Sequence, residues 1–193
     1  TSSATSAAVQ AVVRSVAFSN LTLATSQSER TVMWRLKDGR GTSAIARSSQ
    51  VNVSPAPTLT LPTLAQTYPA GSPGVALVPD ALVEVSSSAV NGSVLTVLGT
   101  YFGPHDRVIM LSQGTEIGQV SLSGDQVLFG GTPVATVTLP TNSSETLTVR
   151  FNSAATSSAI QAVARRVAFR NVALVPGVFE RTISWQLVDG LGV

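Results

Sequence analysis

The sequence contains no cysteine and only one histidine among its 193 residues. Without cysteine the chain can form no disulfide and can offer no thiolate as a nucleophile or a metal ligand. A zinc site takes three or four His, Cys or carboxylate ligands, and one histidine does not supply such a set. The composition therefore excludes thiol chemistry and argues against a resident zinc ion.

Charge is also scarce, because Asp, Glu, Lys and Arg make up 11% of the residues and the formal net charge is +2. A nucleic-acid-binding surface would show a dense basic stripe with aromatic side chains beside it. Here the aromatic share is 5%, and the only basic cluster is Arg165, Arg166 and Arg170. No apolar run approaches the roughly 18 residues of a membrane span. We expect neither a nucleic-acid partner nor a membrane span.

Catalytic motifs are absent as well. His105 adjoins Asp106 between two expected strands, so the pair could be half of a catalytic group or part of a solvated turn. We favour the turn because no motif supplies a nucleophile. Glycoside hydrolysis needs two facing carboxylates, and no motif singles out such a pair. We predict that the protein is not an enzyme, and we assign no catalytic, cofactor-binding or metal-binding residue.

What the chain does contain is an internal repeat. Residues 1–42 align without a gap with residues 152–193, at an offset of 151 and with 22 identities in 42 positions. Trp34 and Trp185 fall at equivalent positions in the two copies. A fixed period of this kind indicates tandem copies of one structural unit.

The repeat also predicts how the chain divides. Residues 54–62 contain three prolines, which forbid helix and favour a short extended linker. We predict that residues 1–53 are the C-terminal part of one repeat unit and that 54–62 form a Pro-rich linker and first strand. Residues 55–193 are then the next unit without its last strand.

That last strand is expected in the first copy, where Ile45, Val51 and Val53 are its apolar positions. The second copy stops at Val193, before an equivalent strand. Unpaired sheet edges recruit strands from other chains. We therefore expect the partners to be neighbouring repeats of the same protein or neighbouring copies of the chain, within a longer fibre.

Alternation of apolar and polar residues, typical of β-strands, runs through most of the sequence. Val32, Trp34 and Leu36 share one face of an expected strand, and the second copy repeats the pattern. Further strands are expected at 58–61, 75–78, 82–85, 93–102, 107–111, 117–122, 126–129, 133–139 and 147–151. Turns are expected at residues 91–92 and 130–131.

Two equivalent segments have helical spacing instead. The apolar face is formed by Val9, Val12, Val13 and Val16 in the first copy, and by Ile160, Val163, Ala164 and Val167 in the second. Thr5 or Ser6, and Thr156 or Ser157, can cap these helices. Many short strands with one short helix per unit predict a β-sandwich.

The order of these motifs resembles a known family. Residues 147–189 read as a strand LTVRFN, a helix ATSSAIQAVARRV, a strand start AFRN and then ERTISWQLVD, followed by GLG. This series resembles the cadherin-like, immunoglobulin-type tandem repeats of large bacterial surface adhesins. The resemblance implies an all-β fold of antiparallel Ig/cadherin-like sandwich repeats with one short helix per unit. It also implies an extracellular location on the bacterial cell surface.

Cadherin-like repeats usually bind Ca²⁺ between domains, so the resemblance raises the question of calcium. Ca²⁺ takes six to eight oxygen ligands. Asp38 and Asp189 are retained at the strand ends, but residues 52–57, 69–71 and 86–88 offer no carboxylate. We therefore expect no cofactor and no stoichiometric interdomain calcium, and we interpret both aspartates as turn formers.

A Glu-Arg pair precedes the Trp-containing strand in both copies, as Glu29-Arg30 and Glu180-Arg181. It could form an ion pair between domains or a salt bridge at the start of the strand. We favour the salt bridge, which contributes little if it is exposed.

These observations predict a non-catalytic structural or adhesive repeat of a large bacterial cell-surface or extracellular fibre protein, acting as a spacer, in adhesion or in a biofilm matrix. The alternative is a carbohydrate-binding module of a secreted protein, which would present exposed aromatic side chains. Binding lost on substitution of Tyr101 or Phe102 would favour that alternative. Trp34 and Trp185 are instead expected to be buried against the valines of the helices.

Overall fold

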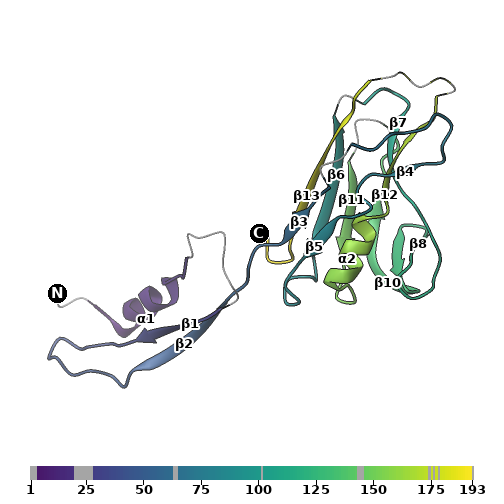
Figure 1. Cartoon of the computed structure of the whole chain (residues 1–193). Helices are drawn as coiled ribbons and strands as arrows, with labels where there is room; N and C mark the ends of the chain where they lie inside the picture. The colour runs from purple at the N-terminus through teal and green to yellow at the C-terminus, as the bar shows by residue number, and fades with distance from the viewer. Residues whose placement is uncertain are drawn as a thin grey trace. The chain divides into compact units, whose positions relative to one another are not determined.

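A computed structural model describes residues 4–19, 28–62, 65–100, 102–142, 146–173, 175, 177 and 179–192. The chain divides into two compact units, Thr1–Pro55 and Ala56–Val193. Within the described residues, each unit contains antiparallel strands and one helix (Figure 1). The expectation of a mostly β, antiparallel fold with a short helix in each unit is confirmed.

The first unit has three described elements, which are α1 (Ser6–Ser15), β1 (Ser28–Trp34) and β2 (Arg47–Val53). The two strands pair antiparallel along their whole length, with Val32 opposite Ser49 and Trp34 opposite Arg47. None of the described residues of this unit is fully buried. A two-stranded hairpin without a covered face is only marginally stable by itself.

The elements of the second unit are β3 (Thr58–Thr60), β4 (Val75–Ala76), β5 (Leu82–Glu84), β6 (Val94–Thr100), β7 (Asp106–Met110), β8 (Val120–Ser123), β9 (Gln126–Phe129), β10 (Thr132–Thr138), β11 (Leu147–Phe151), α2 (Ser157–Ala164), β12 (Val167–Asn171) and β13 (Thr182–Val188). One sheet has the order β13-β6-β11-β10-β9-β8, a second has the order β4-β12-β7, and β3 pairs with β5. Each strand expected between residues 58 and 151 is confirmed, although several ends differ by a few residues.

The alternation along the strands explains the core of the second unit. Leu95 and Val97 of β6, and Val149 and Phe151 of β11, are buried, while the residues between them remain more exposed. These side chains form one apolar cluster with Val108 of β7 and with the inner face of α2. Two sheets that share an apolar core form a β-sandwich.

Helix α2 closes part of this core. Its N-cap is Thr156, whose Oγ1 accepts a hydrogen bond from the backbone N–H of Ala159 at 3.1 Å. Ile160, Val163 and Ala164 are completely or almost completely buried. Thr156 is one of the two caps predicted for this helix. The predicted apolar face is confirmed for Ile160, Val163 and Ala164, whereas Val167 lies in β12.

Helix α1 has the same cap but no covered face. Thr5 Oγ1 accepts a hydrogen bond from the backbone N–H of Ala8 at 3.2 Å. Val12, Val13 and Val16 are 65%, 45% and 57% exposed, whereas their equivalents in the second unit are buried. Local sequence is therefore enough to form the helix in both copies. Only α2 has sheets of its own unit that bury its apolar face.

A polar stripe on α2 pairs with the backbone of β5. Ser157, Gln161 and Arg165 are spaced by four residues and therefore lie on one side of the helix. Gln161 Oε1 accepts from Val83 N at 3.1 Å, and Ser157 Oγ accepts from Val85 N at 3.2 Å. Arg165 Nε donates to the carbonyl just before the strand at 2.9 Å. The helix therefore supplies hydrogen-bond partners to the backbone along one edge of β5, and β3 pairs with the other edge.

Both tryptophans are half-buried, so the prediction that they are buried is wrong. The indole Nε1 of Trp34 donates to Ser49 Oγ at 2.6 Å across the hairpin. Helix α1 buries none of its residues, because a two-stranded hairpin provides no second layer. Trp185 packs against the edge of the core, and the rest of its side chain lines a groove.

The Asp-Gly-x-Gly segments form similar turns. Asp38 Oδ1 accepts hydrogen bonds from backbone N–H groups two and four residues later, at 2.9 and 2.7 Å. Asp189 Oδ1 accepts one from the backbone two residues later, at 2.9 Å. Gly41 and Gly192 then adopt φ values of 84° and 87°, where a side chain would be strained. The interpretation of both aspartates as turn formers is confirmed.

Strand β2 is the predicted last strand of the first copy. Val51 and Val53 lie in it and are half-buried, whereas Ile45 precedes it and is 82% exposed. The predicted strand is therefore present, but it begins after Ile45.

Candidate functional site

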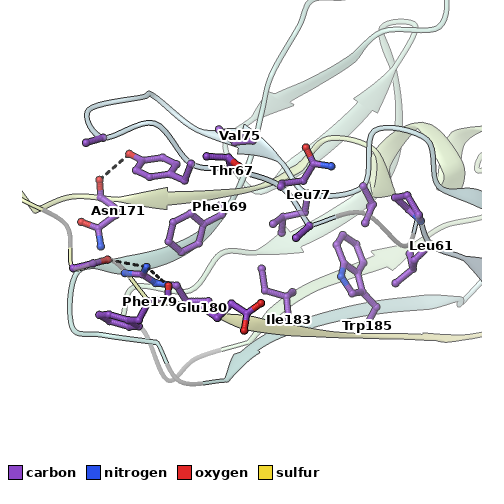
Figure 2. Close-up of a pocket in the computed structure, with 18 of the residues that line it drawn as sticks. Leu61, Thr67, Val75, Leu77, Phe169, Asn171, Phe179, Glu180, Ile183 and Trp185 are labelled. Atoms are coloured by element: carbon purple, nitrogen blue, oxygen red, sulfur yellow. Dashed lines mark hydrogen bonds between the residues drawn. The ribbon is translucent and has the colours of Figure 1, made fainter.

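A groove of about 810 Å³ opens between the two sheets of the second unit. Its walls come from β13, from β4 and β12, and from the chain between β3 and β4. Figure 2 shows Ile183 and Trp185 along one side, with Phe169 and Leu77 facing them. The groove is therefore mainly apolar, with polar groups gathered near Asn171 and Arg181.

Two sheet edges border this groove. β13 is the end strand of the large sheet, and its only strand partner in the described part of the chain is β6; β4 is the end strand of the smaller sheet. Natural sheets protect their edges with charged residues, prolines or short strands. The seven residues Thr182–Val188 include no charge and no proline, whereas β8 at the opposite end has four residues. The groove therefore lies beside the end strand of the large sheet, as far as the described residues define it.

A buried carboxylate joins the two sheets near this groove. Asp106, the first residue of β7, is fully buried. Its Oδ2 accepts hydrogen bonds from Arg181 Nε at 3.0 Å and from Gly103 N at 2.8 Å. Its Oδ1 accepts from Asn171 Nδ2 at 2.6 Å and from Arg181 Nη2 at 3.3 Å. Because Arg181 directly precedes β13, this ion pair links the large sheet to the smaller one.

The surroundings of Asp106 favour its charged form. Burial is the largest single influence and raises the pKa of this carboxyl group. The hydrogen bonds from Arg181, Gly103 and Asn171, together with the charge of Arg181, outweigh burial and hold the pKa of Asp106 below its ordinary value of 3.8. Each carboxylate oxygen already has two donors. Asp106 is therefore suited to fixing the structure and poorly suited to acting as a general base.

Arg181 also organises the chain before β13. Its Nη1 donates to the carbonyl oxygens of Gly177 and Phe179 at 3.0 and 2.8 Å. The guanidinium carbon lies 4.0 Å from the ring centroid of Phe179 and 5.5 Å from that of Phe169. These distances are within the range of cation–π contacts. One side chain therefore holds both the ion pair and the aromatic rings at this end of the groove.

The aromatic rings beside the ion pair pack against one another. The ring of Phe169 meets those of Tyr68 and Phe102 edge to face, at centroid distances of 5.1 and 5.6 Å. Phe102 is half-buried and packs against the core, so it is not an exposed aromatic platform. Tyr101, the other test position for carbohydrate binding, lies outside the described residues.

The arginine of the predicted salt bridge at the start of the Trp-containing strand has a different partner. Arg181 pairs with Asp106 and not with the adjacent Glu180. Neighbouring residues of an extended chain point in opposite directions, so Arg181 faces the interior while Glu180 is exposed. The carboxylate of this pair is fully buried, so the condition of exposure, under which a salt bridge contributes little, is not met.

His105 is exposed in the turn before β7, as interpreted from the sequence. Its neighbour Asp106 points inward to Arg181. Among the described residues, no group of three or more His, Asp or Glu side chains could hold a metal ion.

The arginines near residue 165 form hydrogen bonds within the second unit. Arg165 and Arg166 donate through Nε to the carbonyl oxygens of Ala81 and Leu111, at 2.9 and 3.2 Å.

Where the structure describes the chain, no helix has the length and apolar character needed to cross a bilayer.

Sequence reasoning missed Asp106 as the partner of Arg181, because the two residues are 75 positions apart. It also missed the stripe of Ser157, Gln161 and Arg165. A signal for the stripe was present, since all three residues are identical in the first copy. Identity on the polar side of a helix in both copies indicates that the polar side also has a partner.

No protein-family model, curated protein sequence or solved structure matches the chain.

Proposed function

We propose that the chain is a non-catalytic structural or adhesive repeat of a large bacterial cell-surface or extracellular fibre protein, with units of the cadherin-like, immunoglobulin type. The observation that carries the proposal is the duplicated module, which retains 22 of 42 residues at a constant offset. Duplicated structural units of this kind build arrays. Arrays serve as scaffolds or adhesive fibres more often than as enzymes.

The local structure of the module supports this proposal. Thr5 and Thr156 cap their helices in the same way, and Asp38 and Asp189 accept backbone hydrogen bonds in similar turns. A module whose turns and caps form in two different surroundings is specified by its own residues. That property suits a unit joined end to end many times.

The chemistry of the buried polar groups supports a non-catalytic role. Asp106 is saturated with hydrogen-bond donors, and His105 stands in an exposed turn. Neither residue is paired with a nucleophile in the described structure, as catalysis by a Ser-His-Asp arrangement would require.

Antibodies raised against the whole chain test the location and the role. They should label intact cells that produce the protein, and brief protease treatment of those cells should remove the label. Fab fragments of the same antibodies should reduce attachment or biofilm formation, while Fab fragments against an unrelated surface protein serve as the control.

Labelling only after the cells are permeabilised would contradict the proposal. Saturable binding of the purified chain on a glycan array would instead favour the carbohydrate-binding alternative. Hydrolytic activity abolished by His105→Ala would show that the protein is an enzyme.

A further inference from the structure

Two arginines lie directly opposite one another on the outer face of the smaller sheet. Arg107 of β7 pairs with Arg170 of β12 in the antiparallel register. Their neighbours along the two strands, Val108 and Phe169, are buried, and successive side chains of a strand point to opposite faces. Both guanidinium groups therefore belong to the face that is turned away from the core.

No acidic side chain offsets this pair of positive charges in the described structure. The only acidic residue of the two strands is Asp106, which points inward to Arg181. Arg170 is exposed and has no hydrogen bond or ion pair with another described residue. Like charges directly opposite one another destabilise a sheet, so the folded state contains an unfavourable contact at this point.

The module does not require this arginine in order to fold. Residues 169–171 read Phe-Arg-Asn, and the equivalent residues 18–20 of the first copy read Phe-Ser-Asn. The two positions that are buried in the second unit are identical in both copies, whereas the exposed position differs. A residue that breaks a local rule of strand pairing without a compensating contact is typical of a functional site.

Arg107 is held in place while part of its guanidinium group stays available. Its Nη1 donates to the carbonyl oxygens of Pro104 and Asp106, at 2.8 and 2.7 Å. Its Nε and Nη2 make no hydrogen bond with the described residues. Because this side chain is already ordered, a ligand that binds it loses less free energy to conformational entropy.

We propose that Arg107 and Arg170 together bind a phosphomonoester group on the outer face of the β7–β12 pair. Near neutral pH such a group carries a charge of about −1.5 to −2 and three strong acceptor oxygens, which matches two guanidinium groups. A carboxylate has one charge and is satisfied by a single guanidinium fork. The inference rests on the proposed role at the cell surface, and it assigns to that role a ligand that is recognised by its charge.

A nuclear magnetic resonance titration of the whole chain with methyl phosphate at about pH 8, where the ester is a dianion, tests the site. Backbone amide signals of β7 and β12 around the two arginines should shift in a saturable way. Methyl sulfate is the matched ligand, because it has the same shape and a single negative charge. It should bind at least about tenfold more weakly, since it supports fewer charge-assisted hydrogen bonds.

Substitution of either arginine tests the assignment of the residues. Arg170→Gln and Arg107→Gln should each weaken the binding of methyl phosphate at least about tenfold, because charge-assisted hydrogen bonds are lost. The matched control is Arg150→Gln, which removes an equal charge from an exposed position of β11 in the other sheet. Because salt screens distant charges, this control should change the affinity by less than about twofold.

Three results of these titrations would overturn the proposal. The first is an absence of saturable shifts with methyl phosphate. The second is equal affinity for the two esters. The third is an equal loss of affinity in Arg150→Gln and Arg170→Gln, which would show a general attraction between the chain and anions.

Thermal unfolding separates ligand binding from a structural role of Arg170. Arg170→Gln removes the repulsion between the two guanidinium groups, so the melting temperature should stay the same or rise slightly. Methyl phosphate should raise the melting temperature of the natural chain by mass action and should have little effect on the variant. A clear fall in the melting temperature of the unliganded variant would show that Arg170 stabilises the fold, and the assignment would be wrong.

Vesicles distinguish a lipid headgroup from a soluble ester as the source of the phosphate group. Phosphatidic acid in phosphatidylcholine vesicles presents a phosphomonoester, whereas phosphatidylglycerol presents a phosphodiester. Co-sedimentation with the phosphatidic acid vesicles alone, lost in Arg170→Gln, would assign a lipid headgroup. Saturable binding of methyl phosphate without co-sedimentation would assign a soluble ester. Equal co-sedimentation with both kinds of vesicle would contradict the proposal.

These outcomes are separate from those that test the proposed function. A chain that binds no phosphate ester could still be labelled on the surface of intact cells. Labelling confined to the cell interior would contradict the proposed function even if the two arginines bind their ligand.

Discussion

Arg181 reaches across the sandwich to Asp106, with Nε 3.0 Å from Oδ2, and so joins two sheets through residues 75 positions apart. The carboxylate is fully buried, and the guanidinium is held in place by backbone carbonyls and by an aromatic ring. Removing one partner from such a pair leaves an uncompensated charge in the interior.

Replacing Arg181 by Met should destabilise the second unit by about 3–5 kcal/mol, because Asp106 would stay buried without its cation. Urea unfolding monitored by circular dichroism would measure the change. Arg150→Met is the matched control, since Arg150 is an exposed residue of β11 and its loss should cost no more than about 0.5 kcal/mol. Equal effects of the two substitutions would show that the ion pair contributes nothing.

The ion pair should also make stability depend on pH. The pKa of Asp106 is lower in the folded chain than its ordinary value of 3.8, so the folded state binds its proton less readily than the unfolded state. The contribution of the pair is present above about pH 4 and is lost as the pH falls through the lowered folded-state pKa. Unfolding free energies measured between pH 7 and pH 2 should show this loss in the natural chain. A variant with Asp106→Asn should lack it, and an unchanged pH profile in that variant would contradict the prediction.

Equivalent valines of the two helices should respond differently to truncation. Val163 of α2 is fully buried, whereas Val12 of α1 is 65% exposed. Val163→Ala should cost about 2 kcal/mol, from lost apolar burial and a residual cavity. Val12→Ala should change the unfolding free energy by less than about 0.5 kcal/mol. A large effect of Val12→Ala would indicate that α1 has a packing partner in solution.

The first glycines of the two Asp-Gly-x-Gly turns should also differ. A Cβ added at Gly190 would collide with the carbonyl group of Asn91, whereas nothing lies within 4 Å of a Cβ at Gly39. Gly190→Ala should therefore destabilise the second unit by about 1–3 kcal/mol, as other overpacking substitutions do. Gly39→Ala should be close to neutral. Thermal unfolding of both variants would test the prediction, and equal melting temperatures would contradict it.

Calcium should have little effect on thermal stability. The described residues contain no group of three or more metal-ligating side chains. Saturating a site found only in the folded state stabilises a protein by mass action, so adding millimolar Ca²⁺ or removing it with EGTA should shift the melting temperature by less than about 2 °C. A rise of about ten degrees or more on adding Ca²⁺ would reveal a site formed by other oxygen ligands.

Local patterns in the sequence predicted the elements well. Apolar alternation located the strands, and the spacing of Ile160, Val163 and Ala164 located the buried face of α2. These predictions succeed because the period of the side chains and the direction of burial are local properties. The same patterns failed for Val12 and Val16, which are exposed in the first unit, since a helix forms from its own residues but its burial depends on distant strands.

The groove and the ion pair could not be predicted in the same way. Arg181 was assigned to the adjacent Glu180, and Asp106 was considered only as a neighbour of His105. Which residues meet across a sandwich depends on strand order, and strand order is not encoded in the spacing of nearby residues. The degree of burial of Trp185 likewise depends on β13 being an end strand.

The hydrogen bonds from α2 to β5 bear on how the small sheet formed by β3 and β5 ends. Gln161 and Ser157 occupy the backbone N–H groups of Val83 and Val85, so β5 cannot add a strand on that side. A helix of the same unit therefore takes the place of a further strand, and this edge is closed to pairing with the strands of other chains.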